Sequence, residues 1–168
     1  PAEYREPPKN PTEALARKDG KLWEQAMQAE LQSMAENQVF EECKLPPGQK
    51  TLDTKWVFTY KTNSRGDVIR YKARMTARGF TQQYGIHYHN TDAYMMAMSS
   101  LRTLCVLAAK ENMEFRSIDF TTAFLQGKLS EEIYIEPPDV TIPGLNVRKG
   151  YKLKLARTIY GLKQAGQI

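Results

Sequence analysis

The sequence has only two cysteines, two histidines and no long apolar run, and each shortage excludes a class of protein. Cys43 and Cys105 belong to no paired-cysteine motif, so we expect two reduced, buried thiols rather than a disulfide framework or a zinc site. His87 and His89 have no further Cys or His beside them, which favours a loop or an edge strand. Without a membrane span or a signal-peptide pattern, we expect an intracellular protein that enters no membrane.

The composition is that of a globular protein with an uneven charge. Of the 168 residues, 41% are hydrophobic and 26% charged, enough for one well-cored domain or one domain and part of another. The chain starts with Pro1 and ends without an obvious stop to a fold, so we expect an excerpt or a processed piece. Residues 55–80 carry seven basic side chains and one acidic one, and residues 148–168 carry six and none. Two basic blocks therefore flank an acidic middle.

The first basic block predicts a β-hairpin with strands at 55–61 and 68–77 and a turn at 62–67. Side chains alternate along the second strand, so Arg70, Lys72 and Arg74 share one face, while Ile69, Tyr71, Ala73 and Met75 occupy the packing face. A cationic row suits a phosphate-rich partner, either a nucleic-acid backbone or a nucleotide triphosphate. A solvated edge strand that uses charge against aggregation is the alternative. Charge alone leaves both interpretations open.

The remaining patterns predict an α+β fold. After a proline-rich leader at 1–11, helical segments are expected at 12–16 and 22–36, the second with an apolar stripe. A third helix through 101–109 is strongly apolar, so we expect it to be buried. Short strands are expected at 133–136 and 151–155. Strands and helices do not alternate regularly, which argues against a doubly wound parallel sheet. The stripe in the second helix consists of Trp23, Met27, Leu31 and Met34.

A single carboxylate stands out in the segment from Ile118 to Gly127. Asp119 follows a short apolar stretch and precedes two threonines and an aromatic, Phe124. In one interpretation Asp119 caps a helix by accepting backbone N–H bonds. In the other it is a metal ligand. One carboxylate alone favours the cap.

Four stretches, in order, resemble the reverse transcriptase of copia-type LTR retrotransposons, from about Pro11 onward. They are Thr54-Lys55-Trp56-Val57-Phe58, Arg70 through Gln82, Asp119 through Gly127, and Ile159-Tyr160-Gly161-Leu162-Lys163-Gln164-Ala165. The resemblance implies a right-hand polymerase fold of antiparallel hairpins packed with helices. Residues 12–168 would form a partial reverse transcriptase domain, with fingers at about 12–98 and an incomplete palm at about 99–168. A thumb is absent.

The resemblance also implies site residues and partners. Asp119 would be catalytic and, with the backbone carbonyl of Phe120, would hold Mg²⁺. Phe124 would lie beneath the nucleotide sugar and select deoxynucleotides. The incoming dNTP would further contact Gln164, Lys72 and Arg74. An RNA or DNA template-primer would be bound by Lys61, Arg70, Arg78, Lys152 and Lys154. Such a protein works in a cytoplasmic particle or in the nucleus.

Some features of the family are missing. Two-metal phosphoryl transfer needs more than one carboxylate, and the family's Asp-Asp pair occurs nowhere in the 168 residues, so we expect no polymerisation by this chain alone. The family pattern is also altered at 92–97, Pro137 and Gly166. The alternative is a non-catalytic remnant or a domesticated module that binds nucleic acid or protein through its basic blocks. Self-association or a partner would cover the exposed palm edge.

Overall fold

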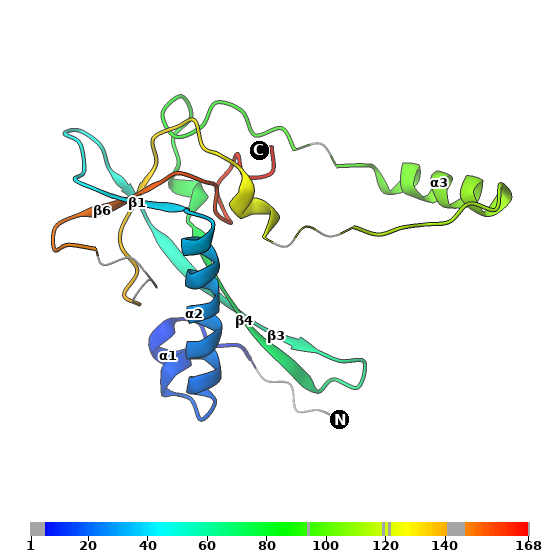
Figure 1. Cartoon of the computed structure of the whole chain (residues 1–168), viewed down its shortest axis with the longest axis horizontal. Helices are drawn as coiled ribbons and strands as arrows, with labels where there is room; N and C mark the ends of the chain where they lie inside the picture. Colours follow the sequence, from blue (N-terminus) through cyan, green and yellow to red (C-terminus); the bar gives the residue numbers. More distant parts are fainter. Residues whose placement is uncertain (1–5, 94, 119, 121, 141–146, 168) are drawn as a thin grey trace.

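The computed structural model describes residues 6–93, 95–118, 120, 122–140 and 147–167, and it combines helices with two sheets (Figure 1). The α+β class predicted from the sequence is therefore confirmed at this level. The helices are α1 (Pro11–Ala16), α2 (Gly20–Glu36) and α3 (Met98–Lys110), with short 3-10 turns η1 (Gly79–Thr81) and η2 (Ala123–Gln126). The strands are β1 (Phe40–Cys43), β2 (Thr51–Leu52), β3 (Thr54–Thr62), β4 (Val68–Ala77), β5 (Tyr134–Ile135) and β6 (Lys152–Leu155).

The two N-terminal helices form as their sequences predict. The Asn10 side chain accepts a 2.8 Å hydrogen bond from the backbone N–H of Glu13, and Pro11 occupies the first turn, where its missing N–H costs no helical bond. In α2 the predicted stripe of Trp23, Met27, Leu31 and Met34 is buried throughout. The helical period of these four residues thus fixes the face that α2 turns to the core.

The predicted hairpin is confirmed as β3 and β4, which pair antiparallel from Thr54↔Ala77 to Thr62↔Val68. It packs across α2, and the indole ring of Trp23 lies 4.7–5.3 Å from the rings of three hairpin aromatics. Ala73 and Met75 are buried as expected, whereas Ile69 is 65% exposed because it lies near the hairpin tip, beyond the cover of α2. The three aromatics are Phe58, Tyr60 and Tyr71.

A second sheet joins distant parts of the chain in the order β1-β6-β5-β2. Strands β1 and β5 lie antiparallel to β6, and β2 lies parallel to β5. Leu153 and Leu155 of β6 and Ile135 of β5 are fully buried in its core, and the strands predicted at 133–136 and 151–155 are confirmed as β5 and β6. This sheet combines strands from both sides of the boundary that we predicted at 98/99.

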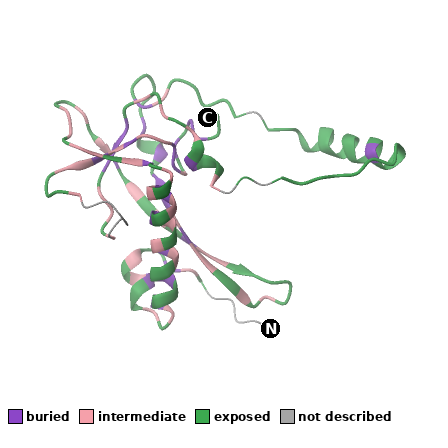
Figure 2. Ribbon diagram, viewed as in Figure 1, coloured by how far each residue is buried: buried purple, intermediate pink, exposed green. Residues whose placement is uncertain are grey.

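The prediction that the third helix is buried is wrong. Helix α3 projects from the rest of the protein between two extended segments (Figure 1), and nearly all of it is exposed (Figure 2). Leu101, Leu104 and Leu107 are 42–48% exposed, and Ala108 is its one buried residue. The same projection corrects the prediction for Cys105, which is exposed, while Cys43 is half-buried. Apolar composition predicts that a helix is more stable when it is buried, but it does not show that another element packs against it.

Residues around Asp119 adopt neither a strand nor an α-helix where the structure describes them. Ile118 and Phe120 lie in extended chain, Thr122 takes a left-handed conformation with φ 56°, and η2 follows. Asp119 itself lies outside the described residues, so the choice between helix cap and metal ligand is not tested. Within the described ranges, no helix is long and apolar enough to cross a membrane.

Candidate functional site

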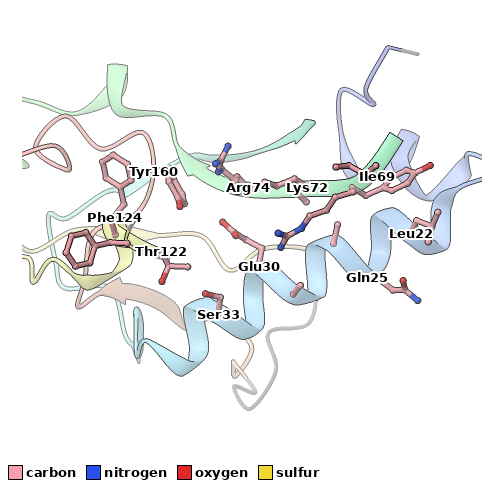
Figure 3. Close-up of a pocket in the computed structure, with 17 residues that line it drawn as sticks. Leu22, Gln25, Glu30, Ser33, Ile69, Lys72, Arg74, Thr122, Phe124 and Tyr160 are labelled. Carbon is pink, nitrogen blue, oxygen red and sulfur yellow. The ribbon is translucent and has the colours of Figure 1, made fainter. Parts of the chain in front are cut away.

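A cleft of about 860 Å³ lies between α2 and β4 and is closed at one end by the η2 segment and Tyr160 (Figure 3). Small residues on α2, Ala26 and Ala29, keep the helix backbone close to the strand without filling the space. Three cations line the opposite wall: Arg70, Lys72 and Arg74. The cleft therefore has one strongly basic wall and one mixed wall.

The basic wall is held by burial and by an aromatic ring. Arg74 is half-buried, and its guanidinium carbon lies 5.1 Å from the centre of the Tyr160 ring, a cation–π geometry. Its Nε atom is buried and has no hydrogen-bond partner among the described atoms. Burial lowers the pKa of Lys72, and the neighbouring charges of Arg74 and Arg70 lower it further. An anion placed between Arg74 and Lys72 would form charge-assisted hydrogen bonds with both side chains.

Tyr160 reaches the cleft because its backbone is fixed to the end of β4. Its carbonyl oxygen accepts a 2.8 Å bond from the N–H of Ala77. The next residue, Gly161, has φ +88°, and a Cβ built there would lie 2.3 Å from the carbonyl oxygen of Ala77. Only glycine permits this approach. Sequence reasoning noted Tyr160 within a motif but assigned it no role, although an aromatic directly before such a glycine was the available signal.

Phe124 forms the end wall together with Tyr160, with ring centres 5.1 Å apart and planes tilted by 56°. Its backbone is anchored on both sides, since Leu125 is fully buried and the Thr158 hydroxyl donates to the Phe124 carbonyl oxygen. The ring remains 40% exposed toward the cleft. The fold thus brings Phe124, Arg74 and Lys72 to the lining of one cleft, three residues that the resemblance assigns to one ligand.

Gln164 does not line this cleft. It is 1% exposed, and its amide accepts a 3.0 Å bond from Gln82 and donates a 2.8 Å bond to the carbonyl oxygen of His87. Gln82 also accepts a 2.8 Å hydrogen bond from the N–H of Lys163. The bonds of Gln82, Lys163 and Gln164 therefore attach the 82–87 loop to the segment that follows Gly161. The imidazole of His87 accepts from the N–H of Gln83, which agrees with the loop prediction. Nucleotide binding by Gln164 stays a prediction.

The residues predicted to bind nucleic acid are scattered. Lys61 and Arg70 face each other in register on the hairpin and are exposed, and Arg78 is exposed beyond the end of β4. Lys152 and Lys154 instead form ion pairs, at 2.6 Å with Glu136 and at 2.8 Å with Glu132. These carboxylates offset the charge of two of the six basic residues in the second block, which counts against a phosphate-binding role for the two lysines.

The predicted metal ligands are only partly in view. Phe120 borders the cleft, whereas Asp119 lies outside the described residues. No group of three or more His, Cys, Asp or Glu that could hold a metal ion occurs in the part of the chain that the structure describes. The described side chains therefore do not by themselves make a complete Mg²⁺ site.

Comparison with protein families decides the relationship that the motifs suggested. Residues 37–168 match the family model described as reverse transcriptase (RNA-dependent DNA polymerase). The chain belongs to this reverse transcriptase family. The match covers the hairpin and the Tyr160 turn, so the cationic strand and the aromatic end wall of the cleft lie within the family's domain, whereas the wall formed by α2 precedes the matched residues.

Curated relatives extend this result to copia-type transposons of plants. The reverse transcriptase domain is 38% identical over 160 residues to the retrovirus-related Pol polyprotein from transposon TNT 1-94 of Nicotiana tabacum. It is 36% and 34% identical to the Pol polyproteins from transposons RE2 and RE1 of Arabidopsis thaliana. These alignments cover 92–94% of the chain but only 10–12% of each polyprotein. No solved structure matches the chain.

Proposed function

We propose that this reverse transcriptase domain supplies the fingers and the first part of the palm of an RNA-directed DNA polymerase. In the complete enzyme it would help to extend a DNA primer with dNTPs by two-metal phosphoryl transfer. The observation that carries the proposal is the cleft, where Lys72 and Arg74 face an aromatic end wall of Phe124 and Tyr160. The cations would hold the triphosphate, and the Phe124 ring would lie against the deoxyribose.

Magnesium belongs to the proposal through Asp119 and the backbone carbonyl of Phe120. Mg²⁺ is usually held by one or two carboxylates together with substrate phosphates, so an aspartate in this motif suits it. Further carboxylates would have to come from outside these 168 residues, which contain no adjacent Asp pair. The chain by itself should therefore bind a nucleotide without incorporating it.

A binding experiment tests the cleft directly. Equilibrium titration with dTTP should give saturable binding, and Arg74→Ala and Lys72→Ala should each weaken it about tenfold or more, because a charge-assisted bond contributes roughly 1.5–3 kcal/mol. Lys149→Ala, an exposed cation outside the cleft lining, is the matched control and should leave affinity unchanged. Equal affinity in all four proteins would overturn the assignment. Primer extension on an RNA template with Mg²⁺ should be no higher than for Asp119→Asn.

A second candidate function is a non-catalytic module that binds nucleic acid, and the exposed cations of the hairpin favour it. Lys61, Arg70 and Arg78 project from both ends of β4 and its partner strand. If they contact phosphates, affinity for single-stranded RNA should fall steeply with salt, and changing all three to Ala should reduce the log–log slope by about 2. An unchanged slope would exclude this surface. Self-association and a protein partner at the palm edge stay predictions.

A further inference from the structure

Glu30 is the acidic residue of the cleft that sequence reasoning did not select. It lies on α2 one turn after Ala26 and one turn before Ser33, and all three line the same wall. Figure 3 shows its carboxylate pointing from α2 into the cleft toward the strand that carries Lys72 and Arg74. Among the described lining residues it is the one acid, opposite three cations.

The carboxylate of Glu30 has an unused oxygen among the described residues. In the described sheets β4 pairs with β3 alone, so its other edge needs acceptors for its N–H groups. The N–H of Ala77 uses the carbonyl of Tyr160, and the backbone of Met75 lies near enough to the Glu30 carboxyl to lower its pKa. The Oε1 atom of Glu30 is buried and has no hydrogen-bond partner among the described residues, and the same is true of Nε of Arg74. Buried polar atoms are costly to leave unpaired, so both would gain from a bound ligand.

The charges around Glu30 indicate which kind of ligand would change its protonation state. Burial raises the pKa of Glu30, while the backbone of Met75 and the charges of Arg74 and Lys72 lower it in part. Arg70 is the third cation of that wall, and the described lining residues of α2 and of 120–124 contribute no further charged group. A polyphosphate between the cations would add several negative charges near the carboxylate. Like charges favour the protonated form of a carboxyl group.

We propose that Glu30 is a positioning residue for the phosphate-binding cations, serving as their counter-ion without ligand and taking up one proton from solvent when a polyphosphate group binds. The protonated carboxyl then donates a hydrogen bond to a phosphate oxygen. This inference rests on the proposed function, because it assumes that Arg74 and Lys72 hold phosphate. Its consequence is that phosphate binding depends on pH through one residue of α2.

The test measures proton uptake together with affinity. Inorganic tripolyphosphate, without Mg²⁺, is titrated calorimetrically into the 168-residue protein in two buffers of different ionisation enthalpy. Glu30→Gln keeps an oxygen near Met75 but cannot titrate, so it should take up fewer protons than the wild type, by up to one. Between pH 6.5 and pH 8.5 the Kd of the wild type should rise more than that of Glu30→Gln, by at most about tenfold per pH unit. At pH 8.5 the variant should bind more tightly.

Controls separate this role from a merely structural one. Glu24→Gln changes an exposed carboxylate on the same helix and should behave as the wild type. Sulfate, which does not titrate in this range, should also cause proton uptake by the wild type, a result that needs no variant to fold. Equal proton uptake and equal pH slopes in wild type and Glu30→Gln would overturn the role of Glu30 and leave the phosphate site intact. Absence of tripolyphosphate binding at every pH would overturn the proposed function and this inference together.

Discussion

The backbone N–H of Ala77 donates a 2.8 Å hydrogen bond to the carbonyl oxygen of Tyr160, and this bond ties the cationic strand to the aromatic end wall. Two glycines make the approach close enough. A Cβ on Gly79 would lie 2.0 Å from the carbonyl oxygen of Gly161, and one on Gly161 would lie 2.3 Å from that of Ala77. The cleft therefore depends on a backbone-to-backbone contact between segments that are far apart in the sequence.

Gly161→Ala should destabilise the protein more than a left-handed backbone alone would. The φ of +88° costs a residue with a side chain about 1–2 kcal/mol, and overlap with Ala77 adds a further penalty of about 1–3 kcal/mol. Gly150→Ala is the matched control, because Gly150 has φ +84° and no atom within 4 Å of its added Cβ. Urea unfolding of both variants measures the difference. Equal losses of unfolding free energy would show that Gly161 has no close neighbour.

Two leucines test the different environments of α2 and α3. Leu31 is fully buried in α2, so Leu31→Ala should lower the free energy of unfolding by about 2–5 kcal/mol. Leu104 is 48% exposed on α3, and Leu104→Ala should change it by only about 0.5 kcal/mol or less. Both substitutions keep a good helix former, so helix propensity cancels. A large loss for Leu104→Ala would mean that α3 is covered in solution.

The two cysteines should react at different rates. Cys105 is exposed on α3, whereas Cys43 is half-buried in β1 and burial raises the pKa of its thiol. Because the thiolate is the reactive form, an alkylating reagent at pH 8 should modify Cys105 first and Cys43 slowly. Cys105→Ser should remove the fast phase, and Cys43→Ser the slow one. A single rate for both thiols would contradict the exposed position of α3.

The ion pair between Lys152 and Glu136 should contribute to the free energy of unfolding at neutral pH but not in acid. A hydrogen bond from Lys152 holds the pKa of Glu136 below its usual 4.5, with a smaller contribution from Thr51. Since the folded pKa is the lower one, the stabilisation is present above pH 4.5 and is lost as the pH falls through the folded value. Glu136→Gln should therefore lower the Tm slightly at pH 7 and not at pH 2. Glu24→Gln should have no effect at either pH, and a decrease in Tm that persists at pH 2 would contradict the ion pair.

Local patterns predicted the parts of the fold that local contacts build. The stripe from Trp23 to Met34 lies within one element, so its period alone gives the buried face of α2, and the alternation in β4 likewise places the buried Ala73 and Met75 on one face. The family resemblance likewise rested on four short stretches and is confirmed by the family match. The cationic row of the hairpin predicts Lys72 and Arg74 as phosphate ligands, the resemblance predicts Phe124, and the fold brings the three to one cleft.

The remaining features of the site depend on distant segments and could not be predicted in the same way. Glu30 looks like one charge on the polar side of an amphipathic helix, and only its packing against β4 gives it a buried oxygen. The position of Tyr160 depends on the hydrogen bond from the N–H of Ala77. Lys152 is paired with Glu136, which lies outside the second basic block. The exposure of α3 has the same origin, because apolar composition does not say what an element packs against.

The two sheets also differ in how far apart their strands lie along the chain, and this sets the order in which the protein assembles. Helices α1 and α2 and the β3–β4 hairpin use contacts within residues 11–77, whereas β1 must find β6, with Phe40 opposite Leu155. Short loops close at lower entropic cost, and N-terminal segments leave the ribosome first. We therefore expect the basic wall of the cleft to form early during synthesis and to remain open until Tyr160 has emerged.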